Sequence, residues 1–139
     1  MSTRSTIAMV KDGGKVIGIY CHFDGYLSHN GKILFEHYKD AAKIEELIMH
    51  GDMSILGSKI NPNPDYPHEF VDAQNDVCVF YNRDRGEPIN AMAYNSIVEF
   101  YKNGDEEDYN YLFKDGKWFY RRCGRKPWNE LTADNTKEW

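Results

Sequence analysis

The sequence predicts an α+β fold: a mainly antiparallel sheet built from two hairpins plus one or two strands, with two or three short helices packed on one face. Three observations support this prediction. β-Branched or aromatic segments flank two Asp-Gly turns, capped amphipathic segments follow the first of them, and 139 residues suit one folded unit. We expect a single domain over residues 1–122 and a C-terminal tail over residues 123–139.

The first hairpin is expected from two weakly alternating segments, residues 3–10 and 15–21. The Asp-Gly-Gly sequence at 12–14 lies between them and has the composition of a tight turn. These two strands should form one part of the sheet.

Helices should follow this hairpin. Ser28 or Asn30 can cap the first helix, and Asp40 can cap a second one with an apolar stripe. Residues 52–57 resemble one further helical turn that begins at an aspartate cap. Residues 61–68 hold three prolines and therefore predict an extended surface loop.

The second half of the chain returns to strands. Residues 77–81 read as a short buried strand, and residues 89–94 as a further one. Residues 96–102 begin with the Ser-x-x-Glu pattern of a capping box and predict a short helix. Aromatic segments at 109–113 and 118–121 flank an Asp-Gly turn and predict the second hairpin.

Composition limits the function. The net charge of −5 argues against a protein that coats nucleic acid through its phosphates. No run of 18 apolar residues and no signal peptide is present, so we expect no membrane association and a cytoplasmic protein with reduced thiols. The aromatic content of 14% exceeds what so small a core hides, which favours rings in a pocket or a subunit interface.

The first candidate site follows the expected strand at 77–81. If Arg83 and Arg85 lie at a strand end, they project to the same side and can converge on one anion. Tyr81 can stack against a base and Asn82 can bind its polar edge. The alternative is that the charged residues of this loop pair with one another and only hold the loop.

A second candidate site lies near the start of the chain. Tyr20, His22 and Asp24 would share one face of a strand, and Tyr26 adds a ring for stacking. Arg4 lies among four hydroxyl side chains, which suits an anion or a sugar. The alternatives are a hydrogen-bonded network that anchors the turn and, for Arg4, a solvated strand edge.

Sequence motifs of common enzyme families are absent, including phosphate-binding, dinucleotide-binding, serine-hydrolase and zinc-protease patterns. We therefore expect ligand recognition with no catalytic residue, no cofactor and no metal site, and leave open whether the protein is an enzyme.

Several segments resemble a family of small hypothetical proteins of tailed bacteriophages, over about residues 2–120. They are STRSTI (2–7), YCHFDGY (20–26), GDMSILG (51–57), RDRGE (83–87) and YLFKDGKW (111–118). The family is similar to phage sponge proteins that counter CBASS or Thoeris immunity by sequestering cyclic nucleotide or cyclic ADP-ribose signals, without cleaving them, at subunit interfaces.

This resemblance implies a homo-oligomeric anti-defence protein in the host cell cytoplasm, with a cyclic nucleotide or cyclic ADP-ribose-type small molecule as its partner. The first alternative is a protein that inhibits a host defence complex directly, with its acidic residues as a DNA mimic. The second is a phosphodiesterase that degrades the signal.

Overall fold

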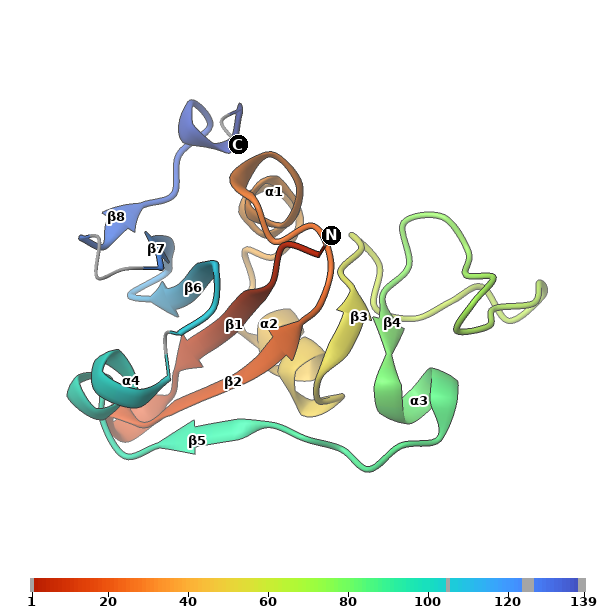
Figure 1. Ribbon diagram of the computed structural model, residues 1–139, viewed down its shortest axis with the longest axis horizontal. Helices are drawn as coiled ribbons and strands as arrows, with labels where there is room; N and C mark the ends of the chain where they lie inside the picture. The colour runs from red at the N-terminus through yellow and green to blue at the C-terminus, as the bar shows by residue number, and fades with distance from the viewer. Residues whose placement is uncertain (1, 105, 124–126, 138–139) are drawn as a thin grey trace.

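The computed structural model describes residues 2–104, 106–123 and 127–137 (Figure 1). Its sheet has the strand order β4-β3-β2-β1-β6-β7-β8, and β5 pairs with β2 outside this path. The pairs β1–β6 and β2–β3 are parallel, and the other pairs are antiparallel. The strands are β1 (Ser5–Val10), β2 (Val16–Cys21), β3 (Met53–Ile55), β4 (Val79–Phe80), β5 (Met92–Tyr94), β6 (Tyr109–Lys114), β7 (Lys117–Arg122) and β8 (Asn129–Glu130).

The α-helices are short: α1 (Lys32–His37), α2 (Ala41–Met49), α3 (Tyr81–Arg85) and α4 (Ile97–Asn103). A single π turn, Leu27–Gly31, leads into α1. The expectation of an α+β fold with a mostly antiparallel sheet is confirmed. Within the described ranges, no helix combines the length and hydrophobicity that a membrane crossing requires.

Alternation along the central strands gives the sheet two apolar faces. The larger core lies where α1 and α2 pack, behind the sheet in Figure 1, and includes Ile7, Ile19, Leu34, Ile44, Leu47 and Tyr111. Helix α4 covers part of the opposite face, where a smaller core is formed by Ala8, Val16, Phe100 and Leu112. The helices thus divide between the two faces, whereas the sequence-based expectation placed them on one face.

Local sequence signals account for most of these elements. The Asp40 side chain accepts a hydrogen bond from the Ala42 N–H (3.2 Å) at the start of α2, and the Ser96 hydroxyl accepts one from the Glu99 N–H (3.1 Å) at the start of α4. These two caps and both hairpins agree with the sequence-based expectation. The cap expected from Ser28 or Asn30 was wrong, because α1 continues from the π turn and the Asn30 amide instead donates to the Ser5 hydroxyl (3.2 Å).

Two predicted elements were wrong. Residues 52–57 form no helical turn, because Met53 pairs with Cys21 in the sheet and the Asp52 carboxylate accepts the Tyr20 N–H (2.9 Å). The strand expected at 77–81 has only Val79–Phe80 in the sheet, and the chain then turns into α3. In both places sheet pairing and side-chain contacts outweigh local propensity.

The described part of the C-terminal segment packs on the domain. Strand β8 pairs with β7, and the Leu131 N–H donates to the Trp118 carbonyl oxygen (2.8 Å). The Trp128 ring lies against Phe100 and Tyr101 (centroid distances 6.2 and 5.2 Å). Trp139, at the end of the expected tail, lies outside the described residues.

Residues 61–76 form an arm that projects from the β3–β4 side of the sheet (Figure 1). The arm returns against the backbone of Gly57, where an added Cβ atom would lie 2.4 Å from the Asp76 carbonyl oxygen. We therefore expect Gly57→Ala to destabilise the protein by about 1–3 kcal/mol, because backbone on both sides must shift. Urea unfolding measures this, with Ser58→Ala as the control, and equal stability of the two variants would contradict the close approach.

Candidate functional site

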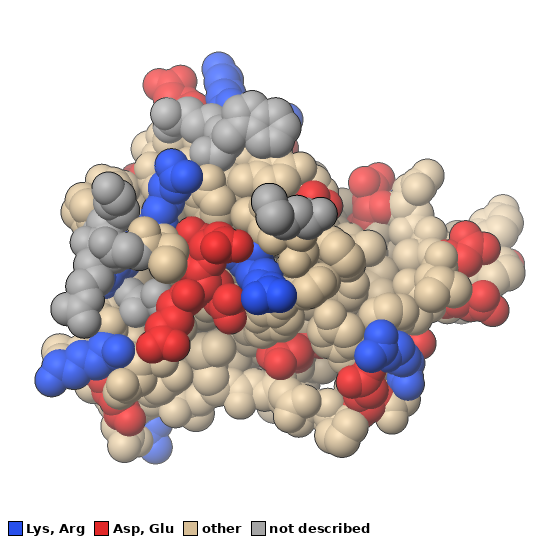
Figure 2. Space-filling view, viewed as in Figure 1, with Lys and Arg blue, Asp and Glu red and all other residues tan. Residues whose placement is uncertain are grey.

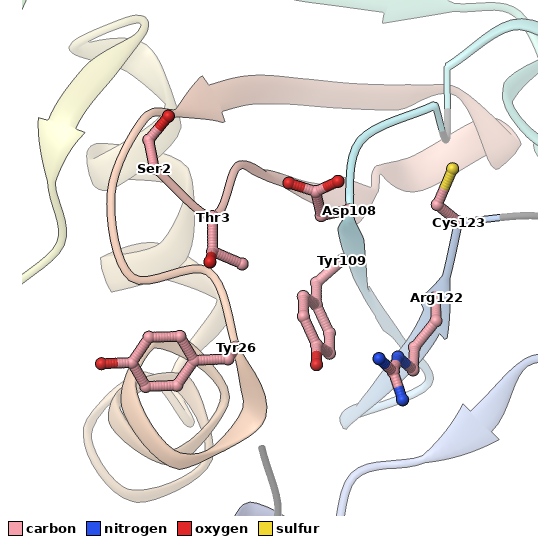
Figure 3. Close-up of a pocket in the computed structure, with 7 residues that line it drawn as sticks. All are labelled: Ser2, Thr3, Tyr26, Asp108, Tyr109, Arg122 and Cys123. Carbon is pink, nitrogen blue, oxygen red and sulfur yellow. The ribbon is translucent and has the colours of Figure 1, made fainter.

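A pocket of about 540 Å³ opens where four chain segments meet at one end of the central strands (Figure 3). The segments are the start of β1, the turn after β2, the start of β6 and the end of β7. The lining residues are Ser2, Thr3, Tyr26, Asp108, Tyr109, Arg122 and Cys123. Its size lies within the range of small-molecule sites.

The first wall is held by the turn after β2. The Gly25 N–H donates to the Thr3 carbonyl oxygen (2.8 Å), and the buried Tyr111 hydroxyl donates to the Gly25 carbonyl oxygen (2.6 Å). A Cβ atom on Gly25 would meet the Thr3 carbonyl oxygen at 2.9 Å, so only glycine permits this approach. Tyr26 is thereby placed beside Thr3 (Figure 3).

The opposite wall is tied to the start of β1 through the backbone. The Arg4 N–H donates to Asp108 Oδ2 (3.0 Å), and the Tyr109 N–H donates to the Arg4 carbonyl oxygen (3.2 Å). The Cys123 N–H donates to the Asp108 carbonyl oxygen (3.1 Å). These bonds give the pocket a defined shape without using the hydroxyls, rings or guanidinium that line it.

The lining combines aromatic and cationic groups. The Arg122 guanidinium lies 5.2 Å from the centroid of the Tyr109 ring, and Arg122 is exposed. The Tyr26 and Tyr109 rings lie on either side of Thr3 (Figure 3). Burial, and then the neighbouring Asp24 carboxylate, raise the pKa of the Tyr26 phenol above its ordinary value.

The candidates from the start of the chain separate in the structure. Tyr26 lines the pocket, while Arg4 contributes its backbone to the pocket wall and is itself exposed. The Tyr20 hydroxyl and His22 Nδ1 are 2.5 Å apart, and His22 lies just past the end of β2. Asp24 leaves that face, because its backbone is left-handed (φ 57°) and its carboxylate lies near Tyr26.

The candidates near residue 83 belong to helix α3 rather than to a strand end. Positions two apart on a helix point in different directions, so Arg83 and Arg85 do not converge as a strand end would allow. Arg85 pairs with Glu87 and lies over the rings of Phe70 and Tyr81. The Asn82 side chain donates to a backbone carbonyl oxygen (2.6 Å) within the same turn.

The Arg83 guanidinium joins α3 to the base of the arm. It donates to the carbonyl oxygens of Ile60 (2.7 Å) and Cys78 (2.8 Å) and to the Asp84 carboxylate (3.0 Å). The Asp84 and His68 side chains beside it are only 6% and 4% exposed. These contacts give Arg83 a structural role in the fold.

Sequence reasoning missed most of the pocket lining: Ser2, Thr3, Asp108, Tyr109, Arg122 and Cys123. The first two were noticed only as neighbours of Arg4. Asp108 was not among the predicted site residues, yet it forms part of the pocket wall. The parallel pairing of β1 with β6 brings these residues together. No local sequence pattern predicts which distant strand β1 pairs with.

Among the described residues, no group of three or more His, Cys, Asp or Glu side chains is arranged to hold a metal ion. The three cysteines are free, and burial raises the pKa of Cys21 to about 12. Comparisons with protein-family models, curated proteins and solved structures found no match. The resemblance to phage proteins therefore stays a prediction.

Replacing Arg83 tests its structural role. We expect Arg83→Ala to lower the free energy of unfolding by about 2–3 kcal/mol, because two backbone carbonyls and a buried carboxylate lose a charged donor. Arg85→Ala is the matched control and should cost no more than about 1 kcal/mol, since its ion pair is solvent-exposed. Urea unfolding measures both, and equal losses would contradict the assignment.

The pH dependence of stability tests the Asp84 contacts. Burial raises the pKa of Asp84, but hydrogen bonds from Arg83 and the Phe80 N–H outweigh it, so the net pKa lies below the usual value. The resulting stabilisation is present above the unfolded pKa of about 3.9 and is lost as the pH falls through the folded pKa. In urea unfolding between pH 7 and pH 2.5, the stability difference between wild type and Asp84→Asn should therefore shrink toward acid. A constant difference would contradict this.

Proposed function

We propose that this chain binds and sequesters a nucleotide-type signal, of the cyclic nucleotide or cyclic ADP-ribose kind, without cleaving it. The observation that carries the proposal is the pocket of about 540 Å³, in which a guanidinium, two phenol rings, a carboxylate and two hydroxyl side chains gather. This combination matches the separate parts of a nucleotide better than it matches an apolar ligand.

Each part of a nucleotide has a counterpart in the lining. The exposed Arg122 guanidinium suits a phosphate, which it can bind through two parallel hydrogen bonds. Tyr26 and Tyr109 offer ring faces for a base. The Asp108 carboxylate accepts hydrogen bonds and therefore suits ribose hydroxyls, as acidic residues do in dinucleotide sites.

The arrangement of the lining residues supports binding of an intact ligand rather than its hydrolysis. Asp108 Oδ2 already accepts the Arg4 N–H, which gives this carboxylate a positioning role in the wall. Hydrolysis by general acid–base catalysis needs a group placed to move a proton at the scissile bond. The described lining offers stacking and charge contacts, which raise affinity without moving a proton.

The biological role that fits such binding is removal of an immune signal by a phage protein, as the resemblance implies. The pocket opens to solvent. A second copy of the chain across its mouth would enclose the ligand, so homo-oligomer formation belongs to this proposal.

Isothermal titration calorimetry with cyclic di- and trinucleotides and cyclic ADP-ribose isomers tests the proposal. At least one ligand should bind, and Arg122→Ala should weaken its binding about 10–100-fold, because a charged contact to phosphate is lost. Arg121→Ala removes the same charge from the neighbouring position, whose side chain points to the other face of β7, and should leave the affinity within about threefold.

Three outcomes would contradict the proposal. Absence of heat for every ligand excludes this class of signal. Recovery of a hydrolysed ligand after incubation identifies a phosphodiesterase. Stoichiometric capture of a host defence protein, with no nucleotide bound, identifies a direct inhibitor.

A further inference from the structure

The arm of residues 61–76 is organised internally around one amide side chain. Gln74 Nε2 lies within hydrogen-bonding distance of the carbonyl oxygens of Asn63 (2.9 Å), Tyr66 (3.0 Å) and Pro67 (3.3 Å). Gln74 Oε1 accepts the Asn63 N–H (2.9 Å). The arm is therefore a shaped element, although it has no helix or strand of its own.

The base of the arm is also anchored. The Lys59 N–H donates to the Asp76 carbonyl oxygen (2.9 Å). The backbone of Asp76 has a left-handed conformation (φ 64°). His68 Nδ1 accepts the Gln74 N–H (3.0 Å), and the His68 ring lies beside the buried Asp84 carboxylate. The arm is thus held in place before any ligand arrives, which lowers the entropic cost of binding.

A cleft of about 450 Å³ lies between this arm and the residues of α1, β3 and β4 that face it. Ile33 and Ile55, both half-buried, give it apolar surface on the domain side, and Val71 does so on the arm side. Asp72 and Asp76, both exposed, supply two carboxylates. No lysine or arginine is present among its described lining residues.

The charge of the arm indicates which kind of occupant would fit this cleft. Four carboxylates and no lysine or arginine occur between positions 60 and 82. Figure 2 shows acidic side chains on the projecting arm at the right of the view. Val71 is 90% exposed at the rim of the cleft, so its side chain is accessible to an occupant.

We propose that this cleft binds the side chain of a lysine or arginine presented by a peptide segment of a partner protein. The aliphatic stem of such a side chain would lie along Ile33, Ile55 and Val71, and its cationic end would reach Asp72 and Asp76. A cation without a stem would leave the apolar walls uncovered, and an apolar side chain would leave the carboxylates unpaired. This site shares no lining residue with the nucleotide pocket, so it stands independently of the proposed function.

An NMR titration of the full ¹⁵N-labelled chain tests the proposal with a defined probe. The probe is an acetylated and amidated Gly-Lys-Gly peptide, and its control is the same peptide with norleucine, which keeps the stem and lacks the charge. The lysine peptide should shift amide signals of residues 71–77 and of His29 and Ile33. Its affinity should exceed that of the norleucine peptide at least tenfold.

Matched variants separate the cleft from general electrostatics. The double variant Asp72→Asn, Asp76→Asn should weaken lysine-peptide binding at least tenfold. The double variant Asp65→Asn, Glu69→Gln removes the same charge from the arm outside the cleft lining and should change the affinity less than threefold. Val71→Ser, at an exposed position, should weaken binding about threefold even if the aspartate variant fails to fold.

The result that overturns the proposal is an absence of shifts at these residues, equal binding of the two peptides, or equal losses in the two double variants. Binding of free spermidine without binding of the peptide would also overturn it, because the occupant would then be a polyamine. Arg122→Ala should leave peptide binding unchanged, which keeps this test separate from that of the nucleotide pocket.

Discussion

The parallel pairing of β1 with β6 is the contact on which the rest of the structure depends. It aligns Ser5–Met9 with Tyr109–Phe113. The hydrogen bond from the Arg4 N–H to Asp108, just before the paired residues, joins positions that are 104 residues apart in the sequence. This register places Ile7 beside Tyr111 in the larger core and Ala8 beside Leu112 in the smaller one. It also brings the start of β1 to the start of β6, where the pocket opens. A shift by one residue would exchange the two faces and remove both cores and the pocket together.

The sequence was informative where structure follows from local chemistry. The Asp-Gly turns, the Asp40 and Ser96 caps and the apolar stripe of α2 were predictable, because each depends on residues close together in the chain. Residues 52–57 and 81–85 were not, since pairing with β2 and the contacts of Asp84 decide their conformation. Of the predicted site residues only Tyr26 lines the pocket, for the same reason: its neighbours there come from distant segments. The charge of Arg83 suggested an anion-binding residue, but its guanidinium donates to the carbonyl oxygens of Ile60 and Cys78 and so holds the arm to the domain.

The pocket and the arm cleft offer opposite chemistry. The pocket presents a guanidinium and phenol rings, which suit an anion that carries a base, while the cleft presents carboxylates and aliphatic walls, which suit a basic side chain. Backbone hydrogen bonds hold both sites in shape: Gly25 to Thr3 beside the pocket, and Lys59 to Asp76 at the base of the arm. A protein that removes a signal and also contacts a cationic partner would need two such surfaces, and each can be disabled without the other.

The central claim is that the pocket holds an intact nucleotide. Mass spectrometry of small molecules released by heat from the protein, purified from cells that make such a signal, tests it most directly. The account predicts a phosphorylated, base-containing molecule of unaltered mass from wild type and its loss from Arg122→Ala. Release of a hydrolysed product, or of the same molecule in equal amount from Arg122→Ala, would contradict it.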